Sequence, residues 1–309
     1  MKKILLAFFL SCLVVSLPAQ TLPEHYAQYG ELILVKLDSA PFPHPDRAQG
    51  HTYQKQLYTA EKNYSDNSVA IFVPKGFRPT AKVDLVVHFH GWRHHIENTL
   101  AEYQLIEQFV ESGRNAILIV PQGPYDAPDS FGGKLEDAGG FQRFMGDVMD
   151  TLRQQGVITN SVLGSIILSG HSGGYQVISS IVARGGLSEQ VKEVWLFDAL
   201  YARREQFSDW FLHYPGRRLI DIYTPHGGTK EESEGFMTWL KAQQPPVPFL
   251  SKNEPEVSAS DLRDNHLIFM YSELEHNDVV FKRHQFCEYL KTSRLGPIKV
   301  YSSPKAAGE

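Results

Sequence analysis

The chain has 309 residues, a length that suits one α/β domain. Hydrophobic residues make up 42% and charged residues 21%, which is the composition of an ordinary globular protein that can bury a large core. The formal net charge is −5 and the chain has no basic run, so we expect neither a nucleic acid nor an anionic membrane surface as a partner.

The beginning of the chain has the layout of a secretory signal peptide. Two lysines precede a mostly apolar stretch, Ile4–Leu17, and Ala19 offers a small residue before a polar segment. This stretch is shorter than the roughly 20 residues that a spanning helix needs. We therefore expect residues 1–19 to be cleaved, the mature domain 20–309 to be periplasmic or secreted, and no stable membrane insertion afterwards. The alternative is a lipid anchor on Cys12, although the residues after it are still apolar.

The rest of the chain alternates between strand-like and helix-like patterns. Continuous apolar runs predict strands at 68–74, 83–91, 115–121, 165–170, 193–199, 218–224 and 266–272. Apolar residues at helical spacing predict helices at 96–112, 141–155, 174–184, 205–212, 231–242 and 278–292. This alternation predicts a single α/β domain with a mostly parallel central sheet and helices on both faces. The longest irregular stretch, 243–261, is expected to be a surface loop.

One predicted turn places a serine between glycines. The segment Gly170-His171-Ser172-Gly173-Gly174 lies where a buried strand gives way to a helix, and it matches the pattern G-x-S-x-G. Small neighbours let the strand and the helix approach, and the helix directs its N–H groups at the serine. A glycine turn with a surface serine is the alternative. The strand–turn–helix context favours Ser172 as a nucleophile.

A serine nucleophile needs a base and an orienting group. His276 follows the last predicted strand at its carboxyl end, so we expect it to be the base. Asp198 ends the strand 193–199 and is the expected orienting carboxylate. Asp221 lies inside its strand, short of the rim, and is expected to pair with Arg217 or Arg218 or to cap buried backbone.

The oxyanion of the tetrahedral intermediate needs two N–H donors. We expect one from Gly173, directly after the nucleophile, and the other from Gly91 or Trp92 in the segment H-F-H-G-W. The alternative for this segment is a metal cluster formed by His88, His90, His94 and His95. The segment lacks a pattern of carboxylate or cysteine ligands that would complete a metal site, and a histidine-glycine turn is enough to account for it. We therefore expect no metal and no cofactor.

Loops that follow the strands would line a pocket above Ser172. The aromatic residues expected as its apolar walls, with ordinary packing as the alternative for each, are Trp92, Tyr125, Phe131, Tyr201 and Trp210. The segment Thr224–Thr229 either approaches the substrate with backbone N–H groups or is only a turn.

These motifs together resemble the α/β-hydrolase superfamily. The resemblance rests on L-S-G-H-S-G-G, with V-V-H-F-H-G-W upstream and L-F-D and E-H-N-D-V-V downstream, and it covers roughly Ser68 to Leu290. Trp92 replaces the second glycine of the family's common His-Gly-Gly turn, and Asp198 stands one strand earlier than the acid of most members.

The resemblance implies a single-domain α/β-hydrolase fold and a serine hydrolase, most often a carboxylesterase, that acts on a small-molecule or polymer ester. Two alternatives stay open. One is an amidase or peptidase on the same triad, and the other is a catalytically silent binding protein on a hydrolase scaffold.

Overall fold

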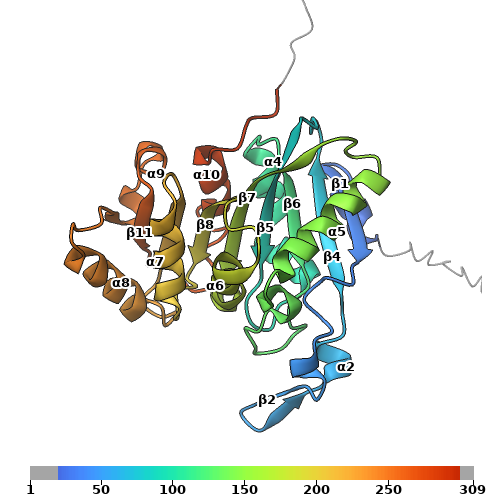
Figure 1. Cartoon of the computed structure of the whole chain (residues 1–309), viewed down its shortest axis with the longest axis horizontal. Helices are drawn as coiled ribbons and strands as arrows, with labels where there is room; N and C mark the ends of the chain where they lie inside the picture. Colours follow the sequence, from blue (N-terminus) through green and yellow to red (C-terminus); the bar gives the residue numbers. More distant parts are fainter. Residues whose placement is uncertain (1–19, 300–309) are drawn as a thin grey trace, which may run out of the picture.

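The computed structural model describes residues 20–299, so the expected signal peptide lies outside the described residues. Nine strands form one sheet in the order β1-β4-β6-β5-β7-β8-β9-β11-β10 (Figure 1). The strands are β1 (Gly30–Lys36), β4 (Ser68–Pro74), β5 (Lys82–Phe89), β6 (Ile117–Pro121), β7 (Val162–His171), β8 (Val191–Phe197), β9 (Arg218–Tyr223), β10 (Leu250–Asn253) and β11 (Leu267–Tyr271). Only the β1–β4 and β4–β6 pairs are antiparallel. The predicted mostly parallel sheet is confirmed.

Helices cover both faces of this sheet. They are α1 (Leu22–Tyr26), α2 (Ala60–Asn63), α3 (Ile96–Glu102), α4 (Leu105–Glu111), α5 (Gly140–Gln154), α6 (Tyr175–Arg184), α7 (Arg204–His213), α8 (Lys230–Ala242), α9 (Ala259–Asp264) and α10 (Gln285–Thr292). No helix in residues 20–299 is long and apolar enough to span a bilayer.

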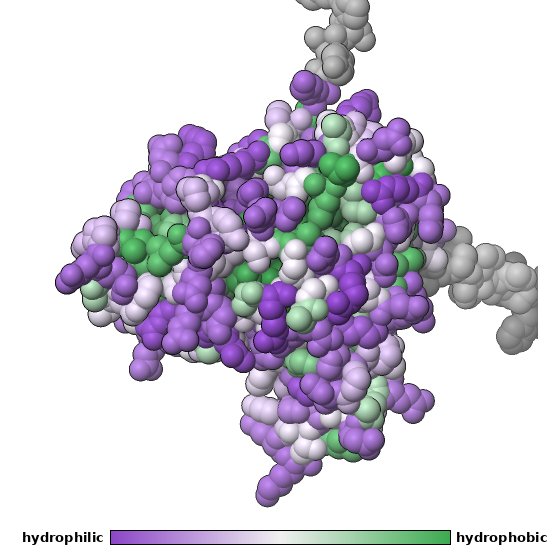
Figure 2. All heavy atoms as spheres, in the orientation of Figure 1, coloured by the Kyte–Doolittle hydropathy of each residue, from purple (hydrophilic) through white to green (hydrophobic). Residues whose placement is uncertain are grey.

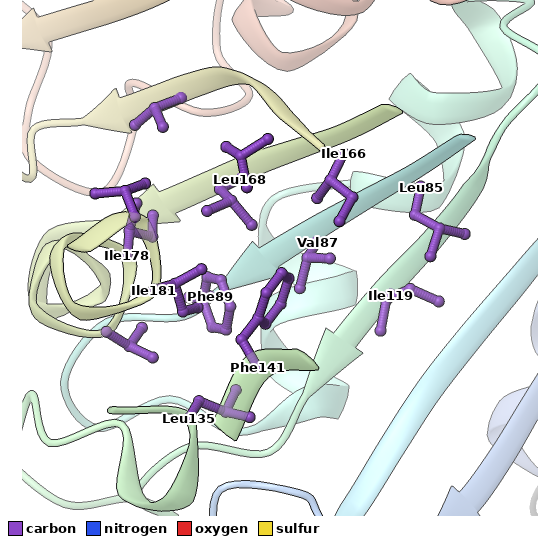
Figure 3. Packing of buried hydrophobic residues seen from close by; sticks show 14 of the residues in the cluster. Leu85, Val87, Phe89, Ile119, Leu135, Phe141, Ile166, Leu168, Ile178 and Ile181 are labelled. Carbon is purple, nitrogen blue, oxygen red and sulfur yellow. The ribbon is translucent and has the colours of Figure 1, made fainter. Parts of the chain in front are cut away.

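Alternate residues of the central strands face opposite layers. Leu85, Val87 and Phe89 of β5 pack with Phe141 of α5 in one buried cluster, which Figure 3 shows from close by. Val86, between them, belongs to a second cluster on the other face with residues of α3, α4 and α10. A strand buried on both sides in this way reads as a continuous apolar run, which is why the central strands were predictable.

Three local predictions were wrong, and the strand β1 was not predicted. The segment 243–261 contains the edge strand β10 and the first residues of the helix α9 rather than only a loop. The helix predicted at 96–112 is two helices, because Gln104 is left-handed with a φ of 49°. The helix predicted at 278–292 begins only at Gln285, after left-handed His284 with a φ of 54°. Edge pairing and left-handed turns leave no periodic pattern in a sequence.

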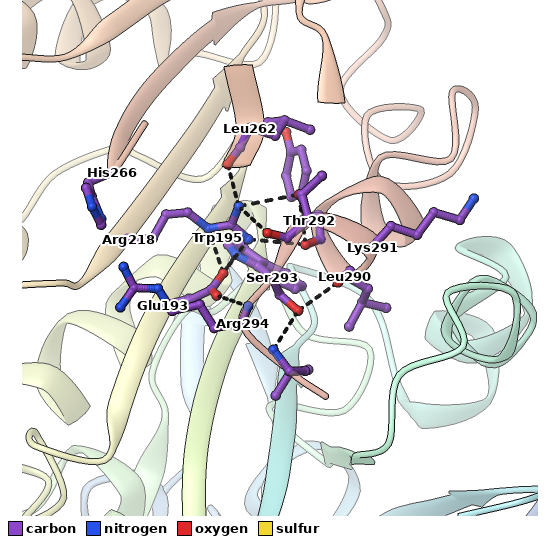
Figure 4. Close-up of polar contacts among 12 residues, drawn as sticks. Glu193, Trp195, Arg218, Leu262, His266, Leu290, Lys291, Thr292, Ser293 and Arg294 are labelled. Carbon is purple, nitrogen blue, oxygen red and sulfur yellow. Dashed lines mark hydrogen bonds and ion pairs between the residues drawn. The ribbon is translucent and has the colours of Figure 1, made fainter. Parts of the chain in front are cut away.

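A buried ion pair anchors the amino-terminal ends of β8 and β9. Nε of Arg218 donates to Oε2 of Glu193 at 2.8 Å, and the same guanidinium donates to the carbonyl groups of Leu262 and Tyr289 (Figure 4). Loss of one partner would leave a buried charge uncompensated, at a cost of about 3–5 kcal/mol. This pair therefore holds α9 and α10 to the end of the sheet away from Ser172.

Residues 41–65, here called the arm, stand out from the body of the molecule (Figures 1 and 2). They include α2 and a two-stranded hairpin, β2 (His51–Tyr53) and β3 (Gln56–Tyr58). Arg47 ties the arm to the body through Asp129, with Nε and Oδ2 2.6 Å apart. The hairpin brings Tyr53 to 5.2 Å from Trp92, measured between ring centroids, beside the predicted site.

Candidate active site

The predicted turn around Ser172 is a strained strand-to-helix turn. Strand β7 ends at His171 and α6 begins at Tyr175, with Ser172 in the left-handed region at a φ of 51°. A Cβ atom on Gly170 would lie 2.7 Å from Ile178, and one on Gly174 would lie 2.8 Å from the carbonyl oxygen of Phe89. Glycine at both positions therefore lets the strand, the helix and β5 approach one another under the serine.

His276 and Asp198, the expected base and orienting acid, are hydrogen-bonded. Nδ1 of His276 and Oδ2 of Asp198 lie 2.6 Å apart, and the carboxylate is fully buried. Asp198 directly follows β8 and has a φ of 45°, a turn that an aspartate tolerates. His276 follows β11, so both side chains come from the carboxyl ends of parallel strands, where such sheets place their ligands.

The carboxylate of Asp198 is held by a segment whose role was left open. Thr224 donates to it through its hydroxyl at 2.7 Å and its N–H at 3.1 Å, and the hydroxyl of Thr229 also donates to it. Burial alone would raise the pKa of Asp198, but the hydrogen bonds from His276, Thr229 and Thr224 outweigh it and hold the pKa below its usual value. Together with His276, the two threonines favour the ionised form of the acid. Their segment was singled out in the sequence, but this contact with Asp198 was not.

The turn that carries Ser172 contacts His276 through His171 rather than through the serine itself. Within residues 20–299 no hydrogen bond joins Ser172 to His276; the residue before the serine, His171, instead packs its ring 4.5 Å from that of His276. Hydrogen bonds to a general base often tighten only when substrate binds. The serine and the histidine that the sequence predicts as nucleophile and base are not hydrogen-bonded to each other in this structure.

The predicted oxyanion loop packs against Ser172. A Cβ atom on Gly91 would lie 2.6 Å from Cβ of Ser172, and one on Gly173 would lie 2.9 Å from Cδ1 of Trp92. The N–H of Arg93 donates to the carbonyl oxygen of Ala127 at 2.9 Å, whereas the N–H of Trp92 donates to no residue in the described part of the chain. The first N–H groups of a helix are also unpaired, and the N–H of Gly173 likewise donates to no residue in the described part of the chain. Trp92 and Gly173 thus each keep an N–H group available near Ser172.

A pocket of about 210 Å³ opens beside Ser172. Its lining residues are Trp92, Ser130, Ser172, Gly173, Tyr175 and Tyr201. Trp92 and Tyr201 were predicted as walls; Tyr175 and Ser130 were not, and Ser130 accepts a hydrogen bond from the Trp92 indole at 2.7 Å.

Three of the predicted aromatic walls lie elsewhere. Trp210 is buried in α7, because the apolar face of that helix turns inward. Cζ of Arg217 lies 4.9 Å from the centroid of the Trp210 ring. Tyr125 stacks on His95 at 4.8 Å. Phe131 packs against His44 of the arm and lines a small cavity of about 20 Å³ behind Gly173 instead.

The histidines before Trp92 are used in structural hydrogen bonds. Nδ1 of His88 pairs with the hydroxyl of Ser169 at 2.9 Å, and burial lowers the pKa of His88 to about 3. Nε2 of His90 accepts from the N–H of Gly123 at 2.9 Å. Residues 20–299 contain no cluster of three or more side chains arranged to hold a metal ion.

The side chain of Asp221 neither pairs with Arg217 or Arg218 nor binds a backbone group in residues 20–299, so that prediction was wrong. Its Oδ2 accepts from the hydroxyl of Ser233 at 2.6 Å, and its Oδ1 has no hydrogen-bond partner among the described residues. Arg218 lies three residues earlier on β9, hence on the opposite face, where Glu193 binds it. Burial raises the pKa of Asp221 to about 7.

The sequence matches no family model, and no curated protein is significantly similar to it. Its backbone is similar to that of solved structures. The feruloyl esterase module from Clostridium thermocellum aligns with a TM-score of 0.51 and 12% identity, over 86% of this chain and 88% of that one. Acetyl xylan esterase from Aspergillus awamori aligns with a TM-score of 0.52 and 12% identity, over 85% of this chain and 100% of that one. With this sheet, these covering helices and the strand-to-helix turn at Ser172, the chain has the α/β-hydrolase fold.

Proposed function

We propose that this protein is a serine hydrolase that cleaves carboxylic esters, with Ser172, His276 and Asp198 as its triad. The observation that carries the proposal is the 2.6 Å hydrogen bond between Asp198 and Nδ1 of His276, formed where the turn after β7 presents Ser172. An ionised aspartate at Nδ1 keeps the ring proton on that nitrogen. Nε2 is then free to accept the proton of the serine hydroxyl.

In the proposed reaction Ser172 Oγ attacks the ester carbonyl carbon while His276 takes the hydroxyl proton. The carbonyl electron pair moves onto oxygen, and the N–H groups of Gly173 and Trp92 stabilise that oxyanion. On collapse the bond to the alcohol breaks and His276 returns the proton to the leaving oxygen. Water then attacks the acyl-serine in the same way, which releases the acid and restores Ser172. The cycle needs neither a metal ion nor an organic cofactor.

An ester is favoured over an amide by the two similar structures, which are named as esterases. The substrate would be a small-molecule or polymer ester. The experiment is a fluorophosphonate probe followed by a panel of p-nitrophenyl esters and the matching anilides. Labelling together with ester turnover supports the proposal. Faster anilide turnover would make the protein an amidase, and absence of labelling would leave a binding protein on this fold.

We also propose that the enzyme is exported, which the signal-like layout of residues 1–19 supports. Mass spectrometry of periplasmic or secreted material should then give a chain that begins near Gln20. An intact amino terminus, or a lipid on Cys12, would contradict cleavage after Ala19.

A further inference from the structure

The residue before the nucleophile contacts the main chain of the base. His276 lies in the loop between β11 and α10, where the chain turns without forming a strand or a long helix. Nε2 of His171 lies 2.9 Å from the carbonyl oxygen of His276. Asp198 orients the imidazole ring, while this second contact acts on the backbone that carries the ring.

The chemistry of its two partners defines the tautomer of His171. A backbone carbonyl only accepts hydrogen bonds, so Nε2 of His171 must carry the proton. Burial and the nearby His276 lower the pKa of His171 well below its usual value, so the ring is neutral and Nδ1 is an acceptor. The hydroxyl of Tyr103 lies 2.8 Å from that Nδ1 and donates to it. Two directed hydrogen bonds therefore run from Tyr103 through His171 to the His276 carbonyl.

Tyr103 is itself rigidly placed. It is fully buried, and its ring stacks on that of His94 with centroids 5.2 Å apart. The left-handed turn at Gln104 ends α3 directly after it, and the side-chain amide of Gln108 holds its carbonyl at 2.7 Å. A tyrosine fixed in this way offers its hydroxyl at a defined position.

We propose that His171 is a positioning residue for the reaction, which holds the main chain of His276 at a set distance from Ser172 and is itself oriented by the Tyr103 hydroxyl. The inference rests on the proposed function. Because His171 and Ser172 are adjacent in the chain, any displacement of the turn carries the base along with the nucleophile. Displacements of about 1 Å at a reacting centre can lower the rate about 100-fold. A hydrogen bond that keeps His276 at a constant distance from Ser172 would therefore protect the rate.

The test compares Tyr103→Phe with a matched control, Ser169→Ala. The first removes the hydroxyl that orients His171, together with its longer contact of 3.4 Å to Nε2 of His94. The second removes a buried hydrogen bond of similar length, 2.9 Å to His88, from the same strand and two residues before His171, without touching His276. We expect Tyr103→Phe to lower kcat and the rate of fluorophosphonate labelling about tenfold with KM nearly unchanged. Ser169→Ala should stay within about twofold of the parent, even where both variants lose similar Tm.

A second readout does not depend on activity. Long-range 1H–15N spectra of the histidine side chains should show His171 neutral and protonated at Nε2 from pH 5 to 8, and Tyr103→Phe should change its Nδ1 shift. An Nδ1–H tautomer, or equal kcat for the two variants, would overturn the inference. If the parent neither hydrolyses esters nor reacts with the probe, the proposed function fails. The spectra alone then decide whether His171 donates its Nε2 proton to the carbonyl of His276.

Discussion

Replacing Asp198 by asparagine tests the orienting acid more sharply than removing it. The change alters one atom in a fully buried group, so packing is retained. The main-chain N–H of Thr224 donates to Oδ1 at 3.1 Å, and a backbone N–H cannot become an acceptor. The amide oxygen of the asparagine must therefore stay at the Oδ1 position, and its nitrogen must face His276.

An amide nitrogen in that place donates to Nδ1 of His276 instead of accepting from it. The ring proton then moves to Nε2, and the base can no longer take the proton of Ser172. We expect Asp198→Asn to lower kcat by about 10³–10⁴, or roughly 4–5.5 kcal/mol of transition-state stabilisation. The Tm should change little. Steady-state kinetics with a p-nitrophenyl ester and a thermal melt measure both quantities.

Asp221→Asn is the matched control, because it makes the same chemical change on the neighbouring strand. The pKa of Asp221 is about 7 in the folded state, against about 3.9 in the unfolded chain. This difference corresponds to about 4 kcal/mol in the free energy of unfolding. The folded state holds the proton more tightly, so this contribution to stability is complete below pH 4 and is lost as the pH rises through 7. Asparagine does not titrate, so the Tm of Asp221→Asn relative to the parent should increase between pH 5 and pH 8.

The kcat of Asp221→Asn should stay within about tenfold of the parent value. The opposite pattern would refute this reasoning. If Asp198→Asn remained active while Asp221→Asn folded but lost its activity, the acid would belong to β9. A flat difference in Tm across the pH range would instead show that Asp221 is not a buried titrating group.

Three further changes test other parts of the site. Ser172→Ala should lower kcat by several orders of magnitude with the fold intact, and fluorophosphonate labelling of the variant would reveal another nucleophile. Gly91→Ala should lower both kcat and the Tm, because its methyl group would lie 2.6 Å from Ser172 Cβ; unchanged kinetics would place the second oxyanion donor elsewhere. Glu254→Gln should lower kcat about tenfold at similar KM, since this buried carboxylate binds Ser272 and Arg283 at the two ends of the loop after β11. A change in Tm alone would make Glu254 purely structural.

Elements whose signals are local could be predicted from the amino-acid sequence. Strands buried on both faces appear as continuous apolar runs, and the glycines around Ser172 mark a turn that larger residues could not form. The alternation of strands and helices implies a parallel sheet, and such a sheet brings the ends of its strands to one rim. Asp198 and His276 could be selected because each follows such a strand end, and the folded chain joins them by a hydrogen bond.

The surroundings of those residues depend on contacts between distant parts of the chain. Tyr103 lies 68 positions before His171 and reaches it because α3 ends in a left-handed turn, and Thr224 reaches Asp198 from the next strand. The packing of the helices also places Tyr175, rather than Trp210, in the pocket beside Ser172. Periodicity and turn chemistry act between near neighbours in sequence, whereas these contacts depend on how separate elements pack and where each helix points its apolar face. The placement of Ser172, Asp198 and His276 at strand ends was therefore readable from the chain, and the side chains that contact them were not.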